Sequence, residues 1–171
     1  SCSRYSWSHS EIIGNYRNDK NEILFRSFGR FVEGLAGRYI TAEDVGTSVK
    51  DMEWVRMETR YVTGISRALG GSGDPAPVTA LGTFSGIKAT VKKQFGKESL
   101  NGLSIAVQGV GHVGYHLCKY LSKEGVNLYI NDIDPNAIKR VINEFGGSVI
   151  DSEKIYDADI DIYAPCALGA T

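Results

Sequence analysis

The sequence has no surplus of charge of either sign and no long apolar run. Its 171 residues contain 19 Lys and Arg against 20 Asp and Glu, a formal net charge of −1. This balance gives no electrostatic reason to expect a nucleic acid or a membrane surface as partner. No apolar stretch approaches the ~20 residues that cross a bilayer, and Ser1–Ser10 is polar, unlike a signal peptide. We therefore expect no nucleic acid and no membrane among the partners.

Cysteine is also scarce. The chain has three, Cys2, Cys118 and Cys166, an odd number at wide spacing. That pattern argues against a disulfide framework and fits a reducing compartment, so we expect a cytoplasmic protein. The hydrophobic content of 42% and charged content of 23% are ordinary for a soluble globular protein. The length allows one domain or two small ones.

Glycine, by contrast, forms an informative pattern. Gly109, Gly111 and Gly114 make Gly-x-Gly-x-x-Gly directly after a short alternating apolar segment. Apolar residues then recur at helical spacing, and a second alternating segment ends at Asp132. The alternative to a nucleotide site is a glycine turn in another kind of α/β unit. The strand before the glycines, the helix after them and the acid at the end of the next strand favour the nucleotide site.

Each of these glycines has a physical role in dinucleotide binding. The first allows a tight turn, the second lacks a side chain that would hold a pyrophosphate away, and the third lets helix and strand pack closely. The helix N-terminus presents free N–H groups to the phosphates. Asp132 follows at close to the ~20 residues expected for an acid on the ribose hydroxyls, which favours NAD over NADP. The predicted NAD-binding residues are Gly109, Val110, Gly111, His112, Val113, Gly114, Tyr115 and Asp132.

The spacing of apolar residues also predicts the helices. Asp19–Glu22 resembles a capping box, with Asp19 as N-cap of a helix that Gly37 would terminate. Thr47 or Ser48 is expected to cap the next helix. The apolar faces predicted for the first and third helices are Leu24, Phe28, Phe31 and Leu35, and Leu81, Phe84, Ile87, Val91 and Phe95.

Strands alternate with helices beyond residue 96, which predicts a parallel sheet with ligands at the carboxyl ends of its strands. The fold class expected is α/β: a Rossmann-type doubly wound parallel sheet with a remnant of an N-terminal α/β substrate domain. The sheet is expected to be truncated at its C-terminus, since about four of the usual about six strands are present. We predict a substrate domain over residues 1–65 and an NAD-binding domain over residues 66–171. Gly70–Pro77 suits a hinge or a domain boundary.

Other reactive side chains give weaker signals. Glu43 and Asp44 are adjacent in a loop before a helix, and chemistry alone favours solvated acids or caps. His112 and His116 have a possible metal-ligand spacing, but no third ligand is evident, so no metal site is predicted. Cys166 has no His or Asp partner in sequence and fits a small buried hydrophobe.

Seven short motifs together resemble the Glu/Leu/Phe/Val dehydrogenase family. They are Gly29–Phe31, Tyr39–Thr47, Asp51–Met52, Thr63–Gly64, Gly73–Ala80, Gly109–Gly114 and Ala164–Gly169. The resemblance covers roughly residues 12–171, and within the family it is strongest to the members that act on leucine.

The resemblance implies an enzyme, an NAD-dependent amino-acid dehydrogenase. It would convert a branched-chain L-amino acid of the leucine type to its 2-oxo acid and ammonia. Asp44 would be the catalytic carboxylate, and Thr79 would contact the nicotinamide end of NAD. Ala164, Cys166 and Ala167 would face the cofactor at the end of a strand. The resemblance also implies a small-molecule amino-acid substrate and a homo-oligomer in the full-length enzyme.

One departure from the family concerns catalysis. Family members carry a Gly-Gly-Gly-Lys segment whose lysine is the catalytic base, and the corresponding region here is Ser6–His9. We therefore expect this chain alone to be inactive. The alternatives are a catalytically inactive NAD-binding fragment, or a member of the same family that acts on phenylalanine or glutamate.

Overall fold

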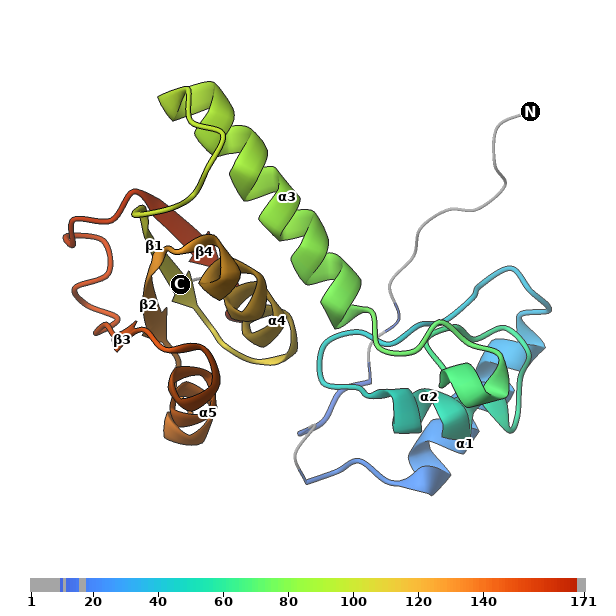
Figure 1. Cartoon of the computed structure of the whole chain (residues 1–171). Coiled ribbons are helices and arrows are strands. Elements are labelled where there is room, and N and C mark those ends of the chain that lie inside the picture. The colour runs from blue at the N-terminus through green and yellow to red at the C-terminus, as the bar shows by residue number, and fades with distance from the viewer. Residues whose placement is uncertain (1–9, 11, 16–17, 169–171) are drawn as a thin grey trace. The chain divides into compact units, whose positions relative to one another are not determined.

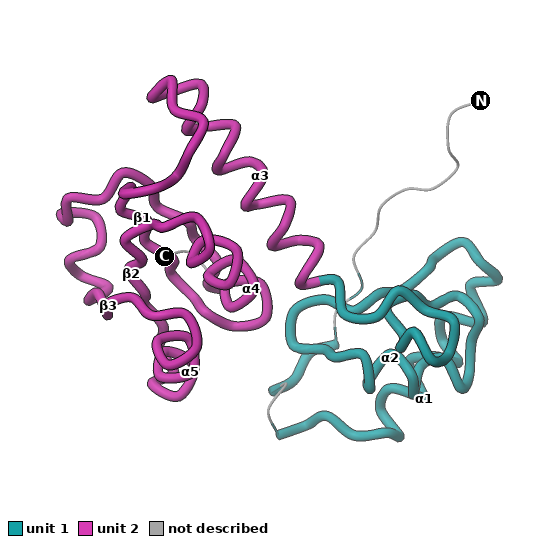
Figure 2. Tube along the Cα trace, viewed as in Figure 1, with its two compact units in different colours: residues 1–75 teal, residues 76–171 magenta. Residues whose placement is uncertain are grey.

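The computed structural model describes residues 10, 12–15 and 18–168. The chain divides into two compact units, residues 1–75 and residues 76–171 (Figure 2). The division falls inside the glycine- and proline-rich stretch that was expected to form a hinge or boundary. The assignment of residues 1–65 to substrate and 66–171 to NAD stays a prediction. Residues 6–9 and Gly169, on which expectations also fall, lie outside the described residues.

The second unit is built on a parallel sheet. Its strands are β1 (Ser104–Gln108), β2 (Asn127–Asn131), β3 (Ser148–Val149) and β4 (Ile162–Pro165), in the spatial order β3-β2-β1-β4. Helix α4 (His112–Leu121) and the short η2 (Ser122–Glu124) connect β1 to β2, and α5 (Pro135–Phe145) connects β2 to β3 (Figure 1). The expected α/β class with a parallel sheet is confirmed. The chain reverses its direction of progress across the sheet between β1 and β4, which is where such sheets bind ligands.

The core of this unit lies between the sheet and its helices. Ile105 and Val107 of β1 are fully buried together with Leu117 of α4 and Val91 of α3 (Ala76–Phe95). The predicted face of α3 was partly wrong, because Leu81 and Phe95 are 46% and 43% exposed. The buried stripe instead includes small residues, which allow α3 to pack closely against α4; it comprises Ala76, Ala80, Ile87 and Val91.

The first unit consists of α1 (Glu22–Gly34), α2 (Val49–Arg56) and the short η1 (Arg67–Leu69). Its core joins the two α-helices to the segment after them through Phe25, Met52, Val55, Val62 and Ile65. Thr41 and Val62, from segments far apart in the chain, form an isolated parallel bridge.

The start of α1 differs from the prediction. Asn21, not Asp19, is the N-cap, and its Oδ1 accepts a hydrogen bond of 2.9 Å from the Leu24 N–H. Asp19 is engaged elsewhere, because its Oδ2 accepts a 2.7 Å hydrogen bond from the Asn15 N–H. That bond closes the preceding loop, so the N-cap lies two residues after the expected one. Ser48 does cap α2, as one of the two predicted alternatives.

The buried face of α1 is also rotated from the predicted one. Phe25, Gly29 and Val32 are buried, while Phe31 is 61% exposed. A Cβ at Gly29 would lie 2.7 Å from the Val55 carbonyl oxygen. The close approach of α2 at this glycine turns that side of α1 inward.

Among the described residues, no helix is both long and apolar enough to cross a membrane.

Candidate functional site

The ends of three neighbouring strands meet at one edge of the sheet. The Gly109 N–H, just after β1, donates a 2.7 Å hydrogen bond to the Asn131 carbonyl at the end of β2. The Cys166 N–H, just after β4, donates a 2.7 Å hydrogen bond to the Gln108 carbonyl. The segments predicted separately to bind NAD are therefore held side by side where β1 and β4 adjoin.

The three glycines of the turn have different surroundings. Gly109 has a φ of +87°, and a Cβ there would lie 2.5 Å from the Ala167 backbone nitrogen. A Cβ at Gly114 would lie 1.9 Å from the Gly109 carbonyl oxygen, so α4 packs on the turn only without a side chain at this position. A Cβ at Gly111 would meet no atom within 4 Å. The first and third glycines are thus required by protein packing, and the second borders open space.

The open space lies at the N-terminus of α4. Gly111 is the N-cap and supplies no side-chain hydrogen bond to the first turn. His112 is exposed as the first helical residue, whereas Val113 packs against the core. The amide groups of a first helical turn carry a partial positive charge and bind anions. This end of α4 therefore suits a phosphate group placed over Gly111.

Asp132 is held beside the turn by backbone donors. Its Oδ2 accepts a 2.6 Å hydrogen bond from the Val110 N–H, and its Oδ1 accepts a 2.8 Å hydrogen bond from the Asp134 N–H. A carboxylate offers about four acceptor positions, so these two bonds leave capacity for hydroxyl donors of a ligand. Ile133, next along the chain, is 93% exposed. Sequence reasoning missed Ile133, since a single apolar residue after an acid carries no pattern.

Behind the turn, Tyr115 ties α4 to α5. Its hydroxyl donates a 2.6 Å hydrogen bond to Glu144 Oε2, and this bond to a carboxylate raises the pKa of Tyr115. The Arg140 guanidinium lies 4.3 Å from the centre of the Tyr115 ring and donates a 3.4 Å hydrogen bond to the Val110 carbonyl. Sequence reasoning missed Arg140, because an arginine on an exposed helix surface gives no local signal. The side chain of Tyr115 is thus engaged within the protein.

The segment after β4 presents small side chains to the turn. Ala164 is buried, Cys166 is half-buried and Ala167 is exposed. Burial raises the pKa of the Cys166 thiol and raises that of Cys118 to about 12. Both thiols therefore stay protonated at neutral pH. Because the thiolate is the nucleophilic form, neither cysteine is activated as a nucleophile.

Thr79 lies in the first turn of α3 and is exposed. The start of this helix is held against α4, because the Tyr120 hydroxyl donates a 3.3 Å hydrogen bond to the Pro77 carbonyl. This hydrogen bond fixes the N-terminal turn of α3, and with it Thr79, relative to α4.

Asp44 lies in the first unit, on a tightly hydrogen-bonded turn. The Asp44 N–H donates to Thr47 Oγ1 at 2.9 Å, and that hydroxyl donates back to the Asp44 carbonyl at 2.7 Å. The Val45 N–H donates a 2.7 Å hydrogen bond to Asp44 Oδ1. These bonds hold an exposed carboxylate in one orientation. The glycine turn predicted to bind NAD belongs to the second unit, so the two predicted parts of the site are carried by different units.

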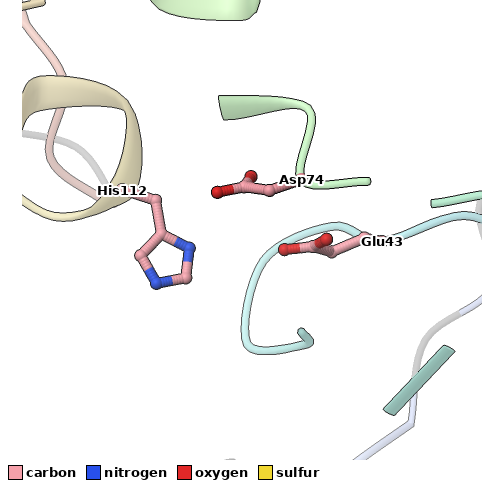
Figure 3. Close-up of side chains that lie close together, drawn as sticks. All are labelled: Glu43, Asp74 and His112. Carbon is pink, nitrogen blue, oxygen red and sulfur yellow. The ribbon is translucent and has the colours of Figure 1, made fainter. Parts of the chain in front are cut away.

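The neighbouring acid, Glu43, has a different environment. It is half-buried, whereas Asp44 is exposed. A carboxylate oxygen of Glu43 lies within 4.8 Å of one of Asp74, also in the first unit (Figure 3). Figure 3 further labels His112 at the start of α4. A pair of acids is common on protein surfaces and by itself assigns no metal.

Comparison with known proteins finds amino-acid dehydrogenases similar to this chain. Residues 8–61 match the family model described as Glu/Leu/Phe/Val dehydrogenase, dimerisation domain. The leucine dehydrogenase of Bacillus subtilis (strain 168) is 58% identical over 160 residues, which are 94% of this chain and 44% of that protein. The resemblance to the Glu/Leu/Phe/Val dehydrogenase family is confirmed.

Two further relatives are named for aromatic amino acids. The phenylalanine dehydrogenase of Lysinibacillus sphaericus is 44% identical over 163 residues, covering 92% of this chain and 43% of that protein. The crystal structure of L-tryptophan dehydrogenase from Nostoc punctiforme matches with a TM-score of 0.64 and 43% identity, covering 92% of this chain and 44% of that one. The chain thus spans less than half the length of these relatives.

Proposed function

We propose that this chain carries part of the active site of an NAD-dependent amino-acid dehydrogenase. The full-length enzyme would convert a branched-chain L-amino acid of the leucine type to its 2-oxo acid and ammonia. The observation that carries the proposal is the open space over Gly111, at the N-terminus of α4 and beside the anchored Asp132 carboxylate. The 58% identity to a leucine dehydrogenase supports the substrate class.

The residues of the second unit fit NAD. The backbone at Gly111 and the first turn of α4 would hold the diphosphate, and Asp132 would accept hydrogen bonds from the adenosine ribose. The negative charge of Asp132 would repel a 2′-phosphate and so favour NAD over NADP. The exposed Ile133 side chain offers an apolar surface to the adenine. NAD, when bound, supplies the hydride acceptor.

The nicotinamide end would lie toward Thr79 and the segment after β4. Ala164, Cys166 and Ala167 have small side chains, so they leave room for a ring at the strand end. In this proposal Cys166 contributes packing and not a nucleophile, because burial raises its pKa. Exclusion of water by such a surface protects hydride transfer from side reactions.

Asp44 is the proposed catalytic carboxylate. It would accept a proton from the substrate amine or return one to it, which requires hydrogen-bond reach of ~2.6–3.2 Å to that nitrogen. An exposed carboxylate on a fixed turn is suited to this role, since the turn removes the cost of orienting it in each cycle.

The test uses the full-length protein in which this sequence occurs, assayed by NADH formation from leucine. We expect Asp44→Asn to lower kcat by about 10²-fold or more, with NADH affinity unchanged. The matched control is Asp19→Asn, which alters another exposed loop acid of the first unit and should leave kcat as in the wild type. Full turnover by Asp44→Asn would remove the catalytic assignment. Absence of turnover of any amino acid by the wild type would remove the proposed function.

Two alternatives are separated by further assays. Residues 1–171 by themselves would bind NAD weakly or not at all and form no NADH from leucine above blank, because they include no Gly-Gly-Gly-Lys segment. Measurable turnover by this polypeptide would contradict that expectation. The 44% identity to a phenylalanine dehydrogenase is the observation behind the second alternative. A panel of leucine, phenylalanine and glutamate, compared by kcat/KM in the full-length protein, decides between these substrates.

We further propose that the full-length enzyme is a cytoplasmic homo-oligomer. The support is the dimerisation domain named in the family model that matches residues 8–61. Sedimentation velocity of the full-length protein would test it, and a monomer at micromolar concentration would contradict it.

A further inference from the structure

A partly buried ion pair joins the segment before α1 to the first turn of α2. Lys20 Nζ lies 2.5 Å from Asp51 Oδ2, and the side chains are 28% and 4% exposed. The same ammonium group donates a 3.1 Å hydrogen bond to the Gly46 carbonyl. Lys20 therefore contacts both the loop that carries Asp44 and α2, the helix that follows this loop.

Asp51 connects this contact to the helix cap. Ser48 Oγ donates a 2.9 Å hydrogen bond to Asp51 Oδ2, and the Asp51 N–H donates a 3.4 Å hydrogen bond to Ser48 Oγ. Since Ser48 is the N-cap of α2, the Lys20 ammonium is coupled to the point where the loop becomes helix.

The other end of the loop is anchored independently. The Thr41 N–H donates a 3.0 Å hydrogen bond to the Tyr61 carbonyl, and the Thr63 N–H donates a 2.8 Å hydrogen bond to the Thr41 carbonyl. Between Thr41 and Ser48, the bonds of Asp44 with Val45 and Thr47 are internal to the loop. Lys20 supplies a side-chain hydrogen bond from outside the loop, to the carbonyl of Gly46, two positions beyond Asp44.

Stability alone explains this arrangement poorly. Burying an ion pair costs desolvation free energy that its mutual attraction often does no more than offset. A side chain that fixes an active-site loop has a separate benefit, since a misplacement of about 1 Å in a reacting group can cost 10²-fold in rate. The bond to the Gly46 carbonyl gives Lys20 a direct means of fixing the loop.

We propose that Lys20 is a positioning residue for Asp44. It would hold the loop of residues 42–47 against the first unit through the Gly46 carbonyl, with Asp51 fixing the ammonium group in place. The inference rests on the proposed catalytic role of Asp44 and assigns no direct contact between Lys20 and substrate.

The test compares Lys20→Met with Arg26→Met in the full-length protein. Arg26 also forms an ion pair within the first unit, with Glu58 at 2.6 Å, but this pair joins α1 to the segment after α2. Each substitution removes a charge and keeps a long apolar stem. Lys20→Met should lower kcat for leucine by about tenfold or more, leave the NADH dissociation constant unchanged, and speed amide hydrogen exchange over residues 43–47. Arg26→Met should retain wild-type kcat and loop exchange even if its melting temperature falls.

Lys20→Arg, which keeps a charged donor, should recover most of the lost kcat. Wild-type kcat and loop exchange in a folded Lys20→Met protein would overturn the proposal, as would an equal loss of kcat in Arg26→Met. If Lys20→Met does not fold, the same comparison is made with Lys20→Gln, and wild-type amide exchange over residues 43–47 in that variant would overturn the proposal. An inactive wild type would instead count against the proposed function, so the two failures are distinguishable.

Discussion

Single side chains of this protein take their roles from partners distant in the chain. Asp132 illustrates this, because its carboxylate accepts a hydrogen bond from the Val110 N–H, 22 residues earlier. The acid thus supports the glycine turn from the protein side while it remains available to a ligand. Cys118 is an ionisable group whose buried surroundings keep it in the uncharged thiol form.

The pH dependence of stability should report the burial of Cys118. Its side chain is fully buried, and loss of hydration, reinforced by the nearby Cys166, raises the pKa from 9.0 to about 12. Below the unfolded-state pKa both states hold the proton, so the contribution to stability is complete. As pH rises from there toward the folded-state pKa, only the unfolded thiol ionises, and the free energy of unfolding should fall by about 1.4 kcal/mol per pH unit.

Urea unfolding of wild type and Cys118→Ala between about pH 8 and pH 11 would measure this contribution. The wild type should lose stability more steeply than the variant above about pH 9, because alanine does not titrate. Parallel curves for the two proteins would show that Cys118 does not have the raised pKa.

At the scale of elements, two glycines of the turn between β1 and α4 should respond differently to substitution, one in stability and the other in cofactor binding. Gly114→Ala would place a Cβ 1.9 Å from the Gly109 carbonyl oxygen, and backbone must move to relieve that contact. We expect this substitution to lower the free energy of unfolding by about 1–3 kcal/mol. Gly111→Ala would meet no atom within 4 Å and has a negative φ of −68°, so the fold should tolerate it.

The same two variants differ in cofactor binding. The methyl group of Gly111→Ala would occupy the space proposed for the diphosphate, so NADH affinity should fall by about tenfold, or about 1.4 kcal/mol, with little change in stability. Fluorescence titration with NADH and thermal unfolding of both variants would measure the two effects. NADH binding by Gly111→Ala at wild-type affinity would place the diphosphate elsewhere.

At the scale of the whole molecule, the division into two units should be visible to a protease. The stretch from Arg67 to Pro75 contains η1 and the glycine-rich segment, and most of its residues are exposed. Exposed segments rich in small residues are preferred sites of nicking. Brief subtilisin treatment of residues 1–171 should therefore cut first between 67 and 75 and leave two fragments.

Mass spectrometry of the first products would locate that cut. A first cleavage within α4 or the sheet of the second unit would show that this unit is less stable than the connecting stretch.

Much of the second unit is readable from the chain because its signals are local. The turn glycines, the alternating strands and the Asp134 cap before Pro135 each depend on residues within one turn or one strand. The expected order of helices and strands and the parallel sheet followed from these patterns. In the first unit, Ser48, one of the two residues expected to cap α2, is its N-cap for the same reason.

Tertiary contacts settled the remainder, chiefly in the first unit. The inward face of α1 depends on the approach of α2 to Gly29, the true N-cap depends on the bond of Asp19 with Asn15, and Thr41 pairs with Val62 rather than with a near neighbour. The contact of Lys20 with Asp51 joins residues 31 positions apart. Helix periodicity and capping rules act over a few residues, so they carry no information about which distant backbone will arrive beside a side chain; only packing of the folded chain supplies it.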